Sequence, residues 1–435
     1  MPETNIKKLI ISYNPWWENN FSLNYKEREI YNTEIKKFIN TPQIIALTGI
    51  RRVGKTTIIY KIINDYISQK IDPKSIFYFS FDSTKNIDLL ELIEEYELIT
   101  KKSIKKDKLI FCFDEIQKVE DWENKLKTIY DIQKLKENIK IYISGSESLF
   151  IKKKSKESLA GRIFDFKVSQ LSFKEYLNFK GIDYSNLLLQ ESTLIKSFDN
   201  YILTQGFPEL INTNKDIEVM KTYTGDILEK VMYADIIKQY NIRDIPTLES
   251  IIKIISKEPG QILDLVSLSN ELKVSRQTIS TYIQYLIDSF LIKKIYNYSK
   301  NTRKSEKKLK KYYPAIISNS VLFSNDILLR SKVFENLVIN QTDVDFFWRD
   351  DYKNEVDAVF VGKNTIPLEI KYGKIDIKGI IRFLKANNLK EGYIISYKEE
   401  RDIKEKGKPI IHVIPAWKFL LNKNKYLKWY LTENE

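Results

Sequence analysis

Residues 44–57 decide the fold of this chain, and they read Ile-Ile-Ala-Leu-Thr-Gly-Ile-Arg-Arg-Val-Gly-Lys-Thr-Thr. The apolar run Ile44–Thr48 predicts a strand, and the pattern over residues 56–68 predicts a helix. Between them, residues 49–56 match G-x-x-x-x-G-K-[ST] at every fixed position. A strand, a glycine loop and a helix in this order predict a loop that binds the phosphates of a nucleotide. A chance glycine-rich turn is the alternative, and it does not account for both flanks.

The residue types in this loop suit a triphosphate with Mg²⁺. Its glycines let the backbone curl, so that N–H groups face the β-phosphate at the positive end of the helix dipole. Lys55 is expected to bind the β- and γ-phosphates, and the Thr56 hydroxyl is expected to bind Mg²⁺. The predicted nucleotide-binding residues are Gly49, Arg52, Val53, Gly54, Lys55, Thr56 and Thr57.

A second apolar run, residues 109–113, ends in the acid pair Asp114-Glu115. At the tip of a strand beside the loop, Asp114 is expected to help hold Mg²⁺ and Glu115 to polarise a water. Two solvated acids at a strand end are the alternative. The pair favours hydrolysis of the nucleotide, and ATP is expected because no N-K-x-D motif for guanine follows: Lys127, not Asp, closes the stretch that begins at Asn124.

Two further segments supply candidates for catalysis. The run at residues 139–144 leads into Ser144-Gly145-Ser146, where Ser146 is the first choice and Ser144 the second for sensing the γ-phosphate. An ordinary polar strand end is equally compatible. Arg162 would stabilise transition-state charge in its own site or in a neighbouring copy's, or it forms a structural ion pair. The predicted catalytic residues are Lys55, Glu115, Ser146 and Arg162.

Composition excludes several kinds of chemistry. With one cysteine and one histidine, an intrachain disulfide, a Cys-His zinc site and a histidine-based triad are excluded. Lys and Arg exceed Asp and Glu by 71 − 58 = 13, and this positive charge favours polyanionic partners. No apolar stretch reaches the length of a membrane helix, and no signal-peptide core is found, so we expect a cytoplasmic protein without a membrane partner.

The order of apolar runs predicts three domains in the 435 residues. Residues 44–168 alternate five strand-like runs with helices, which is typical of a doubly wound α/β domain with a parallel sheet covered on both faces. The runs are residues 44–48, 76–81, 109–113, 139–144 and 163–168. From about 170 to 300 the pattern is helical, and beyond about 320 a mixed α/β pattern returns. The expected fold class is α/β, with a parallel-sheet P-loop core at 1–170, a helical module at 171–310 and a small α/β domain at 311–435.

Residues 248–298 follow the helix–helix–turn–helix–strand order of a winged helix. Its third helix has an apolar stripe, and the opposite face carries side chains able to contact base edges or phosphates: Arg276, Gln277, Ser280 and Gln284. The basic tract at residues 300–311 is expected to be an exposed loop that attracts DNA or RNA irrespective of sequence. An ATPase lid or a protein-docking module is the open alternative.

Near the C-terminus, Asp357 and Glu369 lie on successive strand-like runs and Glu335 on a preceding helix. Glu369 and Lys371 share one strand face because one residue separates them. Such carboxylates can hold Mg²⁺ or Mn²⁺ while a lysine orients water for phosphodiester cleavage. The alternative is a nuclease-like fold retained for binding, with an ion pair between Asp357 and Lys371.

Together these motifs resemble a family of archaeal and bacterial AAA-type ATPases in which a domain of unknown function follows the ATPase. The resemblance covers nearly the full length and rests on residues 49–57, 113–117, 144–146, 159–162, 171–176, 206–209, 335–336, 355–357 and 368–371. It implies an ATPase core that takes ATP and Mg²⁺, a winged-helix module and a C-terminal domain similar to PD-(D/E)xK nucleases.

The leading functional prediction is an ATP-hydrolysing protein that couples its nucleotide state to the winged-helix and nuclease-like parts and associates with nucleic acid. A signalling or scaffolding switch with protein partners and a catalytically inactive nuclease-like domain is the alternative. An ATP-regulated nuclease acting on DNA or RNA is a third hypothesis. Sequence leaves a homo-oligomer and a separate protein partner equally open.

Overall fold

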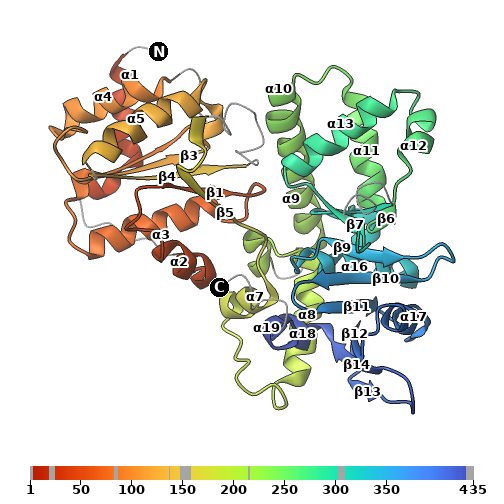
Figure 1. The fold of residues 1–435 in the computed structure, drawn as a ribbon. Helices are drawn as coiled ribbons and strands as arrows, with labels where there is room; N and C mark the ends of the chain where they lie inside the picture. The colour runs from red at the N-terminus through yellow and green to blue at the C-terminus, as the bar shows by residue number, and fades with distance from the viewer. Residues whose placement is uncertain are drawn as a thin grey trace. The chain divides into compact units, whose positions relative to one another are not determined.

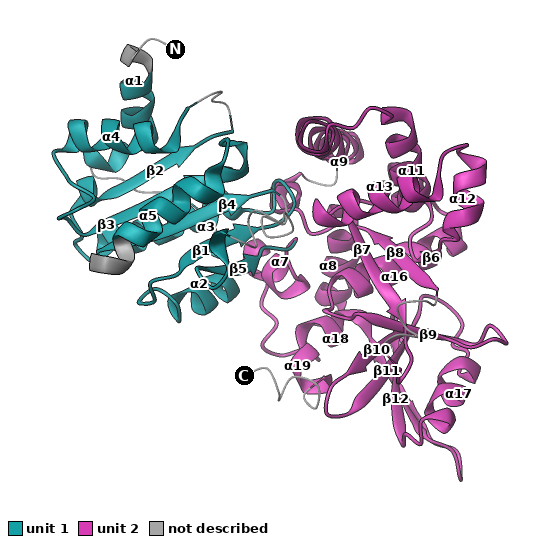
Figure 2. Cartoon of the chain, turned by 45° about the horizontal axis from the view of Figure 1, so that its top comes forward, with its two compact units in different colours: residues 1–169 teal, residues 170–435 magenta. Residues whose placement is uncertain are grey.

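The chain divides into two compact units, residues 1–169 and 170–435 (Figures 1 and 2). The computed structural model describes residues 3–18, 25–82, 87–136, 138–146, 158–213, 216–301 and 309–427. Both units mix helices with sheet, which confirms the predicted α/β class. Among the described residues, no helix combines the length and apolar character needed to cross a membrane.

Unit 1 is built on a parallel sheet, with five strands in the described residues and the order β2-β3-β4-β1-β5. Each predicted strand lies within one residue of its expected bounds: β1 Ile44–Thr48, β2 Ile76–Ser80, β3 Leu109–Asp114, β4 Ile139–Gly145 and β5 Ile163–Lys167. Since all five strands run the same way, their carboxyl ends meet at one edge of the sheet. That edge carries the phosphate loop and the acid pair.

Helices cover both faces of this sheet, as continuous apolar strands require (Figure 1). On one face α1, α4 and α5 enclose an aromatic-rich core, and α2 and α3 lie on the other. β5 differs from the prediction of full burial, because it is the edge strand and its residues are half-buried or exposed. The helices are α1 Glu3–Tyr13, α2 Glu29–Lys36, α3 Lys55–Ser68, α4 Leu89–Thr100 and α5 Trp122–Lys136.

Unit 2 begins with the predicted run of helices. Several start where an Asp or Ser side chain accepts backbone N–H groups of the first turn, including Asp216, Asp244 and Ser275. The predicted order of the 248–298 segment is found as α11, α12, α13 and β7. The helices are α7 Phe173–Lys180, α8 Glu191–Thr204, α9 Ile217–Lys230, a π-helical turn Val231–Ile236, α10 Ile237–Tyr240, α11 Ile245–Lys257, α12 Leu265–Glu271 and α13 Arg276–Asp288.

The rest of unit 2 forms a mixed sheet, with nine strands in the described residues and the order β13-β14-β12-β11-β10-β9-β7-β8-β6. A parallel pairing of β7 with β9 joins the strands of the 248–314 segment to those nearer the C-terminus. The strands are β6 Gln261–Ile262, β7 Ile292–Asn297, β8 Lys310–Pro314, β9 Phe346–Arg349, β10 Glu355–Val361, β11 Thr365–Lys371, β12 Glu391–Ser396, β13 Arg401–Ile403 and β14 Ile410–Pro415.

Five helices accompany this sheet, counted over the described residues from 309 to 427. The longest, α16, carries Glu335 and contacts β8 and β11, whereas α17 contacts β10, β11 and β12. They are α15 Asn319–Leu322, α16 Ile327–Asn340, α17 Lys378–Ala386, α18 Ala416–Leu421 and α19 Lys423–Tyr426.

The basic tract at 300–311 is the main departure from the expected fold. Its last two residues, Lys310 and Lys311, begin β8 instead of ending a loop, and the Lys311 side chain is buried. The prediction of an exposed loop is therefore wrong for these two residues. Residues 302–308 of the tract, Arg303 included, lie outside the described residues.

Candidate functional site

The loop between β1 and α3 contains two glycines in backbone conformations that other residues rarely adopt. At Gly49, φ is 149° and an added Cβ would lie 2.1 Å from the carbonyl oxygen of Val168. The backbone just after β5 therefore passes so close to Gly49 that no side chain fits there. At Gly54, φ is 97°, a left-handed value that favours glycine. These two positions are the fixed glycines of the predicted motif.

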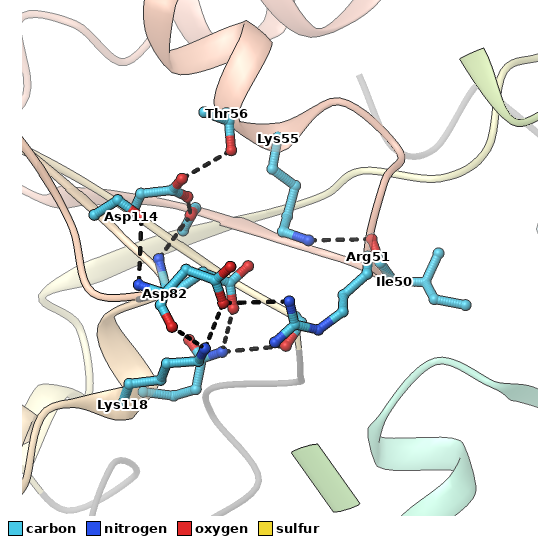
Figure 3. Close-up of polar contacts among 12 residues, drawn as sticks. Ile50, Arg51, Lys55, Thr56, Asp82, Asp114 and Lys118 are labelled. Carbon is cyan, nitrogen blue, oxygen red and sulfur yellow. Dashed lines mark hydrogen bonds and ion pairs between the residues drawn. The ribbon is translucent and has the colours of Figure 1, made fainter. Parts of the chain in front are cut away.

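Lys55 begins α3, and its side chain turns back under the loop (Figure 3). Its Nζ donates hydrogen bonds to the carbonyl oxygens of Gly49 at 2.8 Å and Ile50 at 3.1 Å. Lys55 is buried, with 5% of the residue's surface exposed. A buried ammonium at this place gives the loop the positive charge that a phosphate group needs.

Asp114, at the end of β3, faces the first turn of α3 (Figure 3). Its Oδ2 accepts hydrogen bonds from the Thr56 hydroxyl at 2.8 Å and from the Tyr78 hydroxyl at 3.1 Å, and its Oδ1 accepts one from Ser144. Burial, followed by the charge of Asp114, raises the pKa of Tyr78, so this tyrosine stays a donor. A hydroxyl and a carboxylate side by side are oxygen donors of the kind Mg²⁺ prefers.

Glu115 sits next to Asp114 in a left-handed conformation, with φ of 55°, and is buried. Its backbone N–H donates to Ser144 Oγ at 3.2 Å. Gln117 Nε2 donates to Glu115 Oε2 at 2.7 Å and to Ser146 Oγ at 3.1 Å. The structure thus gathers the predicted Asp114, Glu115, Ser144 and Ser146, with Ser144 beside the first acid and Ser146 linked to the second.

A charged group beside the loop was missed by sequence reasoning. Arg51 Nη1 lies 3.3 Å from Asp82 Oδ1, and Lys118 also pairs with Asp82 while donating to its carbonyl oxygen at 2.9 Å (Figure 3). Burial alone would raise the pKa of Asp82, but the hydrogen bond and charge of Lys118 and the charge of Arg51 lower it. Asp82 follows β2 at the same sheet edge, which was the available signal.

The other predicted loop residues are Arg52, Val53 and Thr57, and the contacts described for them are with the loop and its surroundings. Arg52 adopts a left-handed φ of 63°, and Val53 is fully buried with its carbonyl oxygen 2.9 Å from Arg28 Nη1. Thr57 is half-buried in the first turn of α3. Arg28 lies in the sequence well before the loop, and nothing in its local pattern indicated this contact.

Arg162 is not gathered with the others. It precedes β5, and its carbonyl oxygen accepts from Ile44 at the start of β1, whereas the loop follows the far end of β1. A five-residue strand separates these ends by about 16 Å. Arg162 instead pairs with Asp131 at 3.6 Å and donates to the carbonyl oxygen of Ser158. A role at its own phosphate loop does not fit this placement; a role at a neighbouring copy's loop stays a prediction.

On α13, the expected division between faces is found. The buried side chains are Ile279, Ile283 and Leu286. The four residues predicted to contact nucleic acid are all exposed: Arg276, Gln277, Ser280 and Gln284. Gln284 also donates to Asp288 at 2.6 Å.

The C-terminal carboxylates are brought together, but around a residue that the sequence reading placed in a loop. Lys311 Nζ lies 3.1 Å from Glu335, 2.6 Å from Glu355 and 3.4 Å from Asp357. Lys371 pairs with Glu369 at 2.6 Å. Among the described residues no ion pair joins Lys371 to Asp357, so the alternative predicted for these two residues is not found.

Burial dominates the electrostatics of this cluster. It raises the pKa of Glu335 despite the charge of Lys311. Burial, and then the charge of Asp357, raise the pKa of Glu369 to about 8 against the opposing charge of Lys371. Within the described residues, no three acids are spaced to share a metal ion. The carboxylates as they stand do not fit the metal site predicted for them.

Three segments of the chain match known domains. Residues 41–177 match an AAA domain (AAA_14), residues 195–315 a domain of unknown function (DUF8612), and residues 330–419 another domain of unknown function (DUF4143). The chain therefore carries a P-loop ATPase domain of the AAA class followed by these two domains. This confirms the AAA-type core and the following domain of unknown function that the motifs implied. AAA domains in general bind ATP with Mg²⁺.

The relatives extend along most of the chain. An uncharacterized protein of Methanocaldococcus jannaschii is 27% identical over 428 residues, covering 91% of this chain and 92% of that protein. An uncharacterized protein of Haemophilus influenzae is 28% identical over 278 residues, covering 62% of this chain and 66% of that protein. Neither name states an activity.

Among solved structures, a variant of Thermotoga maritima RuvB is similar at 17% identity and a TM-score of 0.32, covering 61% of this chain and 89% of that one. The Aeropyrum pernix ORC1 protein in complex with DNA is similar at 11% identity and a TM-score of 0.34, covering 74% of this chain and 95% of that one. With TM-scores this low, neither likeness bears on what this chain does.

Proposed function

We propose that this protein binds ATP with Mg²⁺ at the loop of residues 49–57 and hydrolyses it. The observation that carries this proposal is the 2.8 Å hydrogen bond between Thr56 Oγ1 and Asp114 Oδ2. It joins the phosphate loop to the acid strand, 58 residues further along the chain, at the place where a phosphate-bound Mg²⁺ needs both groups. ATP is favoured over GTP because the chain lacks N-K-x-D after β3.

Each residue has a distinct task in this proposal. The Lys55 ammonium, now on the carbonyl oxygens of Gly49 and Ile50, turns to the β- and γ-phosphates. Thr56 and Asp114 would hold Mg²⁺, which when bound neutralises charge on the phosphates. Glu115 orients the attacking water and accepts its proton. Ser146 donates its hydroxyl toward the γ-phosphate.

Two substitutions separate nucleotide binding from hydrolysis. Lys55→Ala removes the buried ammonium and should weaken ATP affinity at least about tenfold, because a hydrogen bond to a charged group is lost. Glu115→Gln keeps the shape of the site but cannot accept a proton, so turnover should fall about a hundredfold or more while ATP still binds. ATP titration and a phosphate-release assay measure the two effects.

Exposed residues of the same type provide matched controls. Lys74→Ala and Glu120→Gln change side chains on the surface of unit 1 and should leave both measurements at the parental level. Parental turnover in Glu115→Gln would refute the role of Glu115, and undiminished ATP affinity in Lys55→Ala would refute the site itself.

We further propose that residues 171–310 form a helical lid and a winged-helix module and residues 311–435 a nuclease-like domain, and that the output of the ATPase passes through these parts of unit 2. The exposed polar face of α13 favours nucleic acid as the partner, since it offers Arg276 and three uncharged hydrogen-bonding groups. A switch that acts through protein partners is the competing proposal. Binding to duplex DNA that weakens steeply with salt would favour the first, and salt-independent or absent binding the second.

A further inference from the structure

A lysine occupies the centre of the C-terminal carboxylate cluster. Lys311 extends from β8, and its Nζ lies within ion-pair distance of Glu335 on α16 and of Glu355 and Asp357 on β10. The side chain of Lys311 is buried, with 5% of its surface exposed. β8 and β10 are not neighbours in the sheet, because β7 and β9 lie between them. One ammonium therefore ties two separated strands and a helix together.

The carboxylates have further partners besides Lys311. The Tyr313 hydroxyl donates to Glu335 at 2.8 Å, and Arg349 pairs with Glu355 at 3.2 Å. Asp357 Oδ2 accepts the backbone N–H of Ile370 at 2.8 Å. These bonds fix the three carboxylates in place, and the oxygens that converge, Glu335 Oε1, Glu355 Oε1 and Asp357 Oδ1, converge on the Lys311 ammonium.

The fourth acid is arranged differently. Glu369 pairs with Lys371 through Oε1, and its Oε2 has no hydrogen-bond partner in the described part of the chain. A single such oxygen does not make a divalent site, because Mg²⁺ and Mn²⁺ take several oxygen ligands at short distances. The remaining ligands would have to come from the acids that hold Lys311.

We propose that the Lys311 ammonium takes the place that a divalent cation would have among these acids, so that the cluster is a metal-independent ion cluster and not a site of phosphodiester cleavage. An ammonium has three N–H donors, which matches the three acids within reach. It provides the positive charge that keeps buried carboxylates together, and removing it leaves those charges uncompensated. The resemblance to nucleases then concerns the fold and not the chemistry.

The surroundings hold the lysine in this position. Lys311 is paired in the sheet on both sides, opposite Ile262 of β6 and Ile295 of β7. Its Nζ also lies 5.5 Å from the centre of the Phe347 ring. Gly260 packs directly against the cluster, since a Cβ at that position would lie 2.9 Å from Glu335 Oε1. A side chain anchored in this way does not withdraw to admit a metal ion.

The test removes the ammonium and offers Mn²⁺ in its place. In Lys311→Met an unbranched stem remains, but the acids lose their shared cation. Without nucleotide, this variant should unfold at a lower temperature than the parent, and Mn²⁺ should raise its midpoint. The parent's midpoint should not respond. Asp357→Asn added to Lys311→Met should abolish the Mn²⁺ effect, which would assign it to this cluster.

Lys310→Met is the matched control, because Lys310 is the neighbouring residue of β8 and its side chain points to the other face of the strand. Its midpoint should be indifferent to Mn²⁺. If Lys311→Met folds and shows no Mn²⁺ response, the proposal is overturned, since the lysine would then not stand in for a metal ion.

If Lys311→Met does not fold, a second comparison that leaves Lys311 in place tests the proposal. Mn²⁺ binding is compared between the parent and Glu335→Gln by electron paramagnetic resonance. Equal binding supports the proposal. A Mn²⁺ ion bound by the parent and lost in Glu335→Gln overturns it, as does Mn²⁺-dependent cleavage of duplex DNA that Glu369→Gln abolishes. None of these outcomes depends on ATP hydrolysis, so the proposal can fail while the ATPase stands.

Discussion

At the scale of single residues, Gln117 links two predicted catalytic residues of the nucleotide site, Glu115 and Ser146. Its Nε2 reaches both the Glu115 carboxylate and the Ser146 hydroxyl, and its Oε1 is buried without a hydrogen-bond partner in the described residues. We infer that it is a positioning residue that fixes the direction of the Glu115 carboxylate. Gln117 belongs to the motif at residues 113–117, but the sequence indicated no role for it, because an amide side chain does not by itself reveal which groups it contacts.

Gln117→Ala should therefore lower the turnover number and leave ATP affinity unchanged. A hydrogen bond to a charged group is worth about 1.5–3 kcal/mol, and about 1.4 kcal/mol corresponds to a tenfold change in rate. The expected loss is about tenfold to a hundredfold in kcat. Gln69→Ala, at the exposed end of α3, is the control and should match the parent. Equal losses of affinity and turnover in Gln117→Ala would indicate a general structural role instead.

At the scale of elements, sequence patterns predicted what depends on local order. The strands of unit 1 and the phosphate loop follow from contiguous apolar runs and fixed glycines, so their bounds could be predicted closely. Lys311 shows the limit. A charge run favours an exposed loop, and the acids that make burial possible lie 24 and 46 residues further on, at Glu335 and Asp357. A local sequence pattern cannot predict partners at such separations.

The raised pKa of Glu369, on β11, predicts how the free energy of unfolding depends on pH. In the folded protein this pKa is about 8, against 4.5 for the unperturbed group. Between these values the folded state holds a proton that the unfolded chain has lost, so the free energy of unfolding falls as pH rises through this window. Asp357, Glu355 and Lys371 are the charged groups that act on it.

Glu369→Gln stays neutral at every pH and should remove this dependence. Relative to the parent, the variant should gain stability as pH rises from about 4.5 to about 8 and gain no more above that value. Thermal unfolding of both chains at the two ends of the window measures the difference. Glu271→Gln, an exposed acid of unit 2, should show a constant offset. A constant offset for Glu369→Gln as well would contradict the raised pKa.

At the scale of the whole molecule, the sequence indicated three successive parts, and the structure adds a connection that no local pattern encodes. The parallel pairing of β7 with β9 places the strands after α13 in one sheet with those that carry Asp357 and Glu369. Residues 296–297 and 346–347 form this pairing across about fifty residues of sequence. Strand pairing over such separations depends on packing of the complete unit, so it could not be predicted from periodicity.

The net charge of +13 belongs to the molecule as a whole and supports a final prediction about its partner. If unit 2 binds duplex DNA, log K should fall linearly with log salt concentration, because each phosphate that is neutralised releases counterions. Arg276 is the one cation among the exposed polar residues of α13, so Arg276→Ala should reduce the slope by about 0.9. Arg401→Ala removes an equal charge from β13 and should change the slope little. Equal slopes for the parent and both variants would show that Arg276 on α13 does not contact DNA. The proposal of a protein partner would then account better for the exposed face of that helix.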